Sequence, residues 1–129
     1  MSIKEMIAEH PDVAGHLNEP LGQTVRHAMY CAAITNACAD ACAAEEGEDR
    51  GPCIRLCNDA SDVCTATYRV ASRRTGGNEA VIRAMLDLCA QACDVCAEMC
   101  ERHDDDHCRR CAEMCRETAR DCRAALDTI

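Results

Sequence analysis

The chain has 129 residues, the length of one domain, so we expect residues 1–129 to form a single domain. Its net charge of −9 and its two aromatic residues, Tyr30 and Tyr68, argue against nucleic-acid binding, which needs basic and stacking side chains. Fourteen cysteines are far more than ordinary globular chains carry, and this content is typical of a disulfide scaffold or a metal protein.

The first predicted element is a short helix at about residues 2–9, which stops before Pro11 because proline disfavours helix in the preceding residue. The N-terminal sequence MSIKEMIAEHPDVAGHLNEP has no apolar h-region, no twin arginine and no cleavage site, and no apolar run could span a membrane. We therefore expect a cytoplasmic protein. In a reducing cytosol, cysteines are more often metal ligands than disulfide partners.

Four longer helices are expected after this segment. Their predicted ranges are 20–45, 52–73, 78–101 and 105–127. Each range is rich in residues that favour helix, and the Gly-, Pro- or charge-rich sequences EEGEDRGP, RRTGGN and ERHDDD separate them. Pro52 suits a first helical turn and Asn78 suits an N-cap. Asp105 or Asp106 suits the cap of the last helix. The predicted fold class is all-α, an antiparallel up-down four-helix bundle with a short extra N-terminal helix.

The cysteines follow helical spacing within each of the four ranges. Successive cysteines of one range are three, four or seven residues apart, so each set lies on one face of its helix. A bundle turns that face inward. The cysteines are Cys31, Cys38, Cys42, Cys53, Cys57, Cys64, Cys89, Cys93, Cys96, Cys100, Cys108, Cys111, Cys115 and Cys122.

The cysteines of paired helices are also predicted to lie level with one another. Residues that lie level on two antiparallel helices have position numbers with a constant sum. This sum is 95 for the first hairpin, the predicted helices 20–45 and 52–73, and 207 or 208 for the second hairpin, the predicted helices 78–101 and 105–127. The pairs are Cys42/Cys53, Cys38/Cys57, Cys31/Cys64, Cys100/Cys108, Cys96/Cys111 and Cys93/Cys115. The stretch from Cys31 to Cys42 covers about 16 Å of helix. We therefore predict a column of thiols rather than a single site.

The thiol column is not centred in the bundle. All four sets lie toward the end that carries the 45–52 and 101–106 loops, hereafter the mouth. The opposite end is expected to hold an ordinary apolar core, hereafter the plug. Its predicted residues are Val25, Tyr68, Val70, Ile82, Met85, Leu86, Ala125 and Leu126.

Three interpretations of the thiols are open. A buried cysteine can be a small hydrophobe, but fourteen in register replace larger side chains that would bury more apolar surface. Zinc takes four ligands, and Cys93, Cys96, Cys108 and Cys111 form a C-x2-C-x11-C-x2-C pattern. A Zn²⁺ with four thiolates carries a charge of −2, however, and no Lys or Arg lies on the cysteine face to offset it. Cu(I) favours thiolates and replaces one thiol proton per ion, so about one ion per cysteine leaves the core near neutrality.

Histidine and methionine side chains add possible ligands. His103 is seven residues after Cys96 and His107 is four before Cys111, so both can face the mouth. They equally fit a solvated loop whose aspartates cap the last helix. His27 lies on the cysteine face near the plug and is expected to be a core histidine. Three methionines fall off the thiol stripe, and we expect the last two to pack between helices or subunits: Met29, Met99 and Met114.

The chain resembles the copper storage proteins, which are cysteine-rich four-helix bundles of bacteria. The resemblance rests on the all-helical pattern, the short leading helix and repeated C-x3-C motifs. These motifs are Cys38/Cys42, Cys53/Cys57, Cys89/Cys93, Cys96/Cys100 and Cys111/Cys115. The missing export signal resembles the cytosolic branch of that family. The resemblance implies a homotetramer of bundles, each holding many Cu(I) ions on the fourteen cysteines, with histidine or polar ligands near the bundle opening.

The leading functional hypothesis is therefore a non-enzymatic protein that stores Cu(I), many ions per chain, for cytosolic storage or detoxification. Its predicted ligands are the fourteen cysteines together with His103 and His107. One alternative is a zinc or mixed-metal thiolate buffer. Another is a thiol redox protein using the CxxC pairs Cys93/Cys96 or Cys108/Cys111, which would require an exposed cysteine of low pKa. No partner other than copper and further copies of the chain is expected, neither nucleic acid nor membrane.

Overall fold

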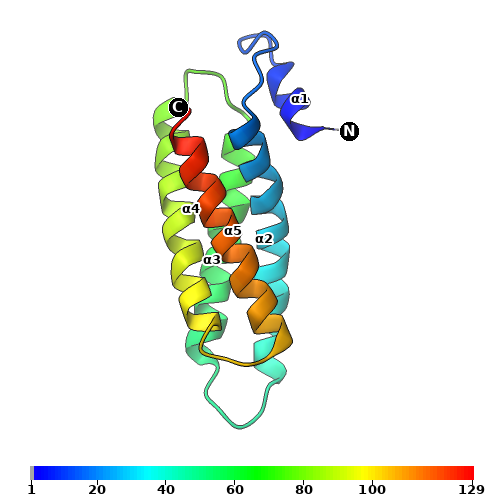
Figure 1. Cartoon of the computed structure of the whole chain (residues 1–129), viewed down its shortest axis with the longest axis vertical. Helices are drawn as coiled ribbons and strands as arrows, with labels where there is room; N and C mark the ends of the chain where they lie inside the picture. The colour runs from blue at the N-terminus through cyan, green and yellow to red at the C-terminus, as the bar shows by residue number, and fades with distance from the viewer. Residues whose placement is uncertain (1) are drawn as a thin grey trace.

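The computed structural model describes residues 2–129, which form five helices and no strand. The helices are α1 (Ile3–Ala8), α2 (Glu19–Ala44), α3 (Gly51–Ala71), α4 (Glu79–Cys100) and α5 (Asp106–Leu126). Helices α2 to α5 run alternately up and down as a four-helix bundle, and α1 lies outside it beside the start of α2 (Figure 1). The predicted fold class is confirmed, with each helix end within about two residues of its expected position.

The helices are arranged around the bundle in chain order. Helix α2 packs against α3 and α5, and α4 packs against the same two helices, so α2 and α4 lie diagonally opposite. The α2–α3 and α4–α5 loops therefore meet at one end, drawn at the bottom of Figure 1. This end is the mouth predicted from the cysteine positions. The α3–α4 loop closes the opposite end beside the C-terminus.

Capping residues fix where the helices begin. The Asn18 side chain accepts a hydrogen bond from the Leu21 amide at 2.9 Å, and Pro52 lies in the first turn of α3. Asn78 and Asp105 occupy the predicted N-cap positions of α4 and α5, but neither side chain makes a capping hydrogen bond to its helix. Asp105 bonds instead to Arg50, which joins the two mouth loops.

The interior changes composition along the bundle axis. Toward the α3–α4 loop, Leu21, Val25, Ile82 and Leu86 are fully buried and form the plug. Three of these residues were expected there: Val25, Ile82 and Leu86. Ala125 is also buried as expected, while the four other predicted plug residues are only half-buried: Tyr68, Val70, Met85 and Leu126. None of the helices in residues 2–129 combines the length and the apolarity that crossing a membrane requires.

Helix α1 is docked on α2 through a close backbone approach. Gly22 is buried, and a Cβ atom at this position would lie 2.7 Å from Cβ of Lys4. Ile7 packs into the core beneath this contact, and Nζ of Lys4 pairs with Glu19 at 2.7 Å. The missing side chain of Gly22 is therefore what lets α1 lie against the bundle.

Candidate metal centre

All fourteen cysteines carry free thiols inside the bundle. Each is buried, with at most 2 % of its surface exposed, and residues 2–129 contain no disulfide. Their sulfur atoms approach one another at 3.6–4.0 Å, for example Cys42 to Cys53 at 3.6 Å and Cys57 to Cys111 at 4.0 Å. The cysteine faces of the four long helices thus meet inside the bundle and form the predicted column of thiols. Ligation of metal by these cysteines remains a prediction.

The level pairs of the first hairpin are confirmed. Cys42 and Cys53 are in contact, and the sulfur atoms of the pairs Cys38/Cys57 and Cys31/Cys64 each lie within 4.8 Å. In the second hairpin, Cys96 and Cys111 lie within the same distance. Contacts between hairpins are equally close, such as Cys57 to Cys96 at 3.6 Å, so the two ladders interdigitate.

The sulfur atoms form overlapping groups of a size that fits a metal ion. In each group all ligand atoms lie within 4.8 Å of one another. The groups are Cys38/Cys57/Cys100/Cys111, Cys31/Cys64/Cys93, Cys96/Cys111/Cys115 and Cys38/Cys42/His107/Cys108. Because Cys38 and Cys111 each belong to two groups, neighbouring ions would share ligands. This sharing is typical of a polynuclear thiolate site rather than of separate closed sites.

His107 is the histidine that reaches the thiols. Its Nδ1 atom lies 3.4 Å from Sγ of Cys38 and 3.6 Å from Sγ of Cys108, and its Nε2 atom lies 3.0 Å from Glu45. Burial is the largest single influence and lowers the pKa of His107, but the bonds to Cys38 and Glu45 and the nearby negative charges together leave the pKa raised. The structure therefore places this predicted residue at the mouth end of the column.

His103 takes a different position. Its side chain is buried beside Glu48, with Nδ1 3.6 Å from Oε2 of Glu48 and without a hydrogen-bond partner. Within residues 2–129, none of the thiol groups of ligand size includes His103. The structure thus brings His107 to the thiols but not His103, although both have a helical phase that points to the mouth.

Arg50 corrects the expectation that no basic side chain borders the thiols. It precedes α3, is 7 % exposed, and donates from Nη1 to Asp105 at 2.6 Å and to Sγ of Cys108 at 3.8 Å. The guanidinium holds the pKa of Asp105 below its usual value. Among residues 2–129 it is the one buried Lys or Arg side chain. The mouth therefore carries a fixed positive charge that helical phase alone did not reveal.

Burial nevertheless favours the protonated form of the thiols next to Arg50. Burial raises the pKa of Cys42 to about 12, and burial also raises the pKa of Cys108. A metal ion that binds here must displace these protons. For a monovalent ion that displaces one proton the exchange leaves the local charge unchanged, whereas a divalent ion held by four thiolates would leave a charge of −2 to be offset.

Two further predictions concern residues beside the column. His27 was expected in the core, but it lies in the seam between α2 and α5, where it bonds to Asp121 and approaches Glu117 at 3.7 Å. The expectation was wrong because polar partners on α5 hold the ring at the edge. Met99 and Met114 are half-buried against the core, and Met29 is exposed.

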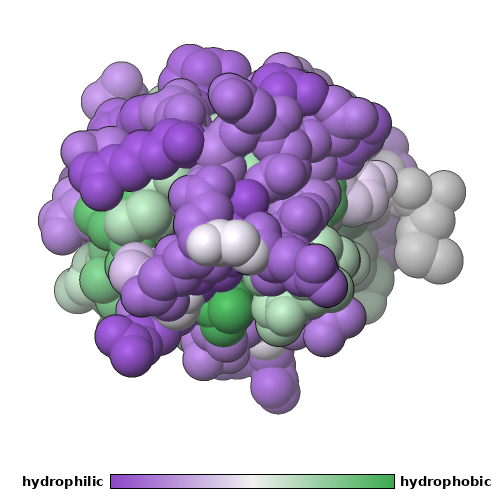
Figure 2. Space-filling view, turned by 90° about the horizontal axis from the view of Figure 1, so that it is seen from below, coloured by the Kyte–Doolittle hydropathy of each residue, from purple (hydrophilic) through white to green (hydrophobic). Residues whose placement is uncertain are grey.

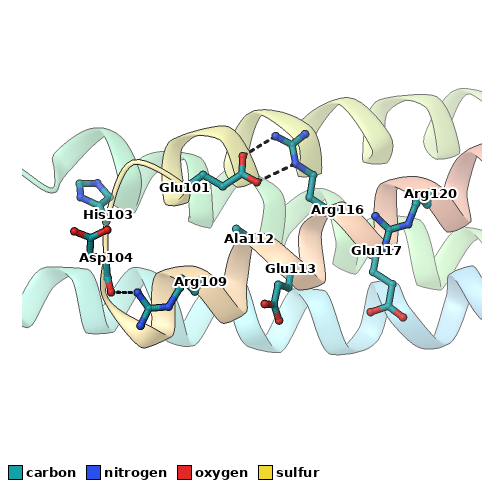
Figure 3. Close-up of a pocket in the computed structure, with 9 residues that line it drawn as sticks. All are labelled: Glu101, His103, Asp104, Arg109, Ala112, Glu113, Arg116, Glu117 and Arg120. Atoms are coloured by element: carbon teal, nitrogen blue, oxygen red, sulfur yellow. Dashed lines mark hydrogen bonds and ion pairs between the residues drawn. The ribbon is translucent and has the colours of Figure 1, made fainter.

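A charged groove lies on the outer surface of α4 and α5 next to the mouth (Figure 3). Its volume is about 460 Å³, and ion pairs cross it, such as Arg116 to Glu101 at 2.7 Å. No cysteine lines the groove, and three residues of the 101–106 loop connect it to the mouth: Glu101, His103 and Asp104. Seen from the mouth end, the surface is mostly hydrophilic, with smaller hydrophobic patches at the left margin and below the centre of the view (Figure 2).

A comparison with known protein families identifies the family of this cysteine-lined bundle. A family model described as copper storage protein matches residues 17–127. The chain belongs to the copper storage protein family. No curated protein matches the chain.

Solved copper storage proteins are similar in sequence and structure. The copper storage protein Ccsp from Streptomyces lividans, loaded with 10 copper equivalents, is 37 % identical with a TM-score of 0.92, covering 99 % of this chain and 100 % of that one. A structure of the cytosolic copper storage protein of that organism with five coppers is 41 % identical, with a TM-score of 0.82 over 86 % and 95 % of the two chains. The apo copper storage protein 3 of Bacillus subtilis is 27 % identical, with a TM-score of 0.67 over 80 % and 95 %.

Proposed function

We propose that this protein binds and stores many Cu(I) ions in the cytoplasm, on thiolates that line the bundle core, without catalysing a reaction. The observation that carries the proposal is the column of fourteen buried, unpaired thiols, in which sulfur atoms of neighbouring cysteines approach at 3.6–4.0 Å. Soft thiolates select Cu(I), which forms stable low-coordinate complexes with them. Family membership and copper-loaded relatives that cover nearly the whole chain support the same function. Storage can serve detoxification or supply.

Charge balance favours a monovalent ion along the column. The one buried cation of the described residues, Arg50, lies at the mouth, so anionic four-thiolate clusters deeper in the bundle would be uncompensated. Arg50 can offset one excess negative charge at the mouth. We therefore expect about one Cu(I) per cysteine along the column, with His107 as an additional ligand at the mouth.

A zinc or mixed-metal buffer is the second candidate function. The group Cys38/Cys57/Cys100/Cys111 supplies four sulfur atoms within 4.8 Å, as a tetrahedral zinc site requires. The group of Cys38, Cys42, His107 and Cys108 also has four ligands, but both groups use Cys38. These two zinc sites therefore cannot fill together, so a load of several zinc ions would need other groupings of the thiols. The thiol redox alternative is weaker, because each of its CxxC cysteines is fully buried.

Anaerobic titration of the reduced protein with Cu(I), in the presence of a competing chelator, tests the proposal. Native mass spectrometry should count about one tightly bound ion per cysteine, because each Cu(I) replaces one thiol proton. Saturation at one or two copper ions would refute storage. Preferential uptake of about three Zn²⁺ ions, by the four-ligand rule, would favour the zinc buffer.

We also propose that the protein is a homotetramer, as the family resemblance implies. An exposed apolar stripe on α4, made by Val81, Leu88 and Val95 at seven-residue spacing, supports contact with another copy of the helical bundle. Light scattering coupled to gel filtration should give the tetramer mass, and Leu88→Glu should lower it without changing the copper capacity. A monomeric wild-type protein would contradict this proposal and leave the storage proposal intact.

A further inference from the structure

Within the thiol column, one pair of level positions on α2 and α3 carries no sulfur; such a pair of level positions is hereafter called a rung. Position numbers that add up to 95 lie level on α2 and α3, and three such rungs are cysteine pairs: Cys42/Cys53, Cys38/Cys57 and Cys31/Cys64. The rung between the last two is Thr35/Ala60. Both residues are fully buried, and Oγ1 of Thr35 donates to the carbonyl oxygen of Cys31 at 2.6 Å. The hydroxyl therefore serves its own helix, and α2 and α3 offer no soft ligand at this level.

The facing helices locate this gap within the column. On its mouth side, Cys57 contacts Cys96 at 3.6 Å and Cys111 at 4.0 Å. On its plug side, Cys31 contacts Cys115 at 3.7 Å and Cys93 at 3.9 Å. The Thr35/Ala60 rung thus faces the part of α4 and α5 that lies between the cysteines in contact with Cys57 and the cysteines in contact with Cys31. At this level all thiols come from one side of the bundle.

The gap divides the thiols into two contact clusters. The mouth cluster, linked to the first two rungs, comprises Cys38, Cys42, Cys53, Cys57, Cys96, Cys100, Cys108 and Cys111. The deep cluster, linked to the third rung, comprises Cys31, Cys64, Cys89, Cys93 and Cys122. The remaining cysteine is Cys115. Its sulfur lies within 4.8 Å of those of Cys96 and Cys111 and 3.7 Å from that of Cys31, so it approaches both clusters.

Resting on the proposed function, we propose that the Thr35/Ala60 rung is a waist in the column and that Cys115 transfers Cu(I) across it. Cu(I) moves between thiolates by ligand exchange, in which a bond to the incoming sulfur forms as a bond to the outgoing sulfur breaks. The incoming thiol gives up its proton and the vacated thiolate regains one, so charge and oxidation state do not change. Exchange needs sulfur atoms in mutual reach, and Cys115 provides this reach between the clusters. The plug closes the other end of the deep cluster, so its copper arrives through the waist.

Removal of Cys115 tests the waist directly. Reduced Cys115→Ala and the matched single-thiol control Cys53→Ala are loaded anaerobically with chelated Cu(I), and alkylation at successive times identifies the thiols still free. In the control, the mouth cluster should hold about one Cu(I) ion less, by the one-ion-per-thiol rule, while the deep-cluster cysteines still become protected. In Cys115→Ala, the mouth cluster should fill normally while the deep-cluster cysteines remain reactive. Equal protection of the deep cluster in both variants would overturn the proposal.

A second variant adds the missing ligands. Thr35→Cys with Ala60→Cys completes the rung, so it should bind about two more Cu(I) ions by the one-ion-per-thiol rule and restore deep-cluster filling to Cys115→Ala. Failure of this restoration, in protein of unchanged helical circular dichroism, would also count against the waist. Failure of the wild type to bind copper would instead refute the storage function. The two proposals are thus tested separately.

Discussion

At the scale of single residues, Arg50 is the feature that most affects the chemistry of the mouth. Its guanidinium is held between the carboxylate of Asp105 and the sulfur of Cys108 and also approaches Glu48 at 3.5 Å. Asp105 in turn begins α5, so this one side chain fastens the α2–α3 loop to the start of α5. Its Nε atom is buried without a partner, which shows how closely the loops cover it.

We expect Arg50→Gln to destabilise the apo protein, because it leaves Asp105 without its charged partner and frees the two mouth loops. Urea unfolding should show a lower midpoint for Arg50→Gln than for Arg110→Gln, since Arg110 is exposed and a surface change of this kind alters stability by less than about 0.5 kcal/mol. Equal midpoints for the two variants would show that the Arg50 pair contributes nothing to folding.

At the scale of elements, α1 depends on a single position of α2. A Cβ atom at Gly22 would lie 2.7 Å from Cβ and 3.3 Å from Cα of Lys4, so the neighbouring backbone would have to move. Alanine is itself better than glycine in a helix by about 1 kcal/mol. The 26-residue α2 will therefore stay helical in Gly22→Ala, and the six-residue α1 will be displaced.

Hydrogen exchange measures this displacement. In Gly22→Ala, amides of Ile3–Ala8 should exchange at least ~10-fold faster, which corresponds to a loss of about 1.4 kcal/mol of local stability. Gln23→Ala, an exposed change on the next residue, should leave the exchange of α1 unaltered. Copper capacity should be the same in both variants, because no cysteine lies in α1. Unchanged protection of α1 in Gly22→Ala would refute this account of its docking.

At the scale of the whole molecule, the buried thiols make folding sensitive to alkaline pH. Burial raises the pKa of Cys42 from 9.0 to about 12, so between these values the folded protein holds a proton that the unfolded chain has released. The free energy of unfolding of the reduced apo protein should therefore fall as the pH rises from 9 toward 12, by up to about 1.4 kcal/mol per pH unit for each such thiol. Urea unfolding between pH 8 and 10 should show a smaller slope in Cys42→Ala. Parallel slopes would mean that the Cys42 thiol does not contribute.

Much of the architecture could be predicted from the sequence because it depends on local rules. Helical period fixed the cysteine face, and level positions across a short hairpin fixed pairs such as Cys42/Cys53. Arg50 and His27 could not be placed in this way. The burial of Arg50 depends on how two loops, distant in the sequence, close over one another, and His27 depends on the partners that α5 offers. Contacts of this kind, between residues of different helices or loops, leave no periodic pattern in the sequence.

The thiol column also links the lifetime of the protein to its cargo. Where leucines fill the plug, the thiol half contains small side chains, which bury less apolar surface and stabilise the empty protein less. Ions that bind the folded chain more tightly than the unfolded one stabilise the folded form, and the column holds the thiols together for binding only in the folded form. The empty protein is thus the form most readily unfolded and digested by proteases, and the filled protein is the form that persists. In a cell, its abundance would then rise with available copper even at constant synthesis.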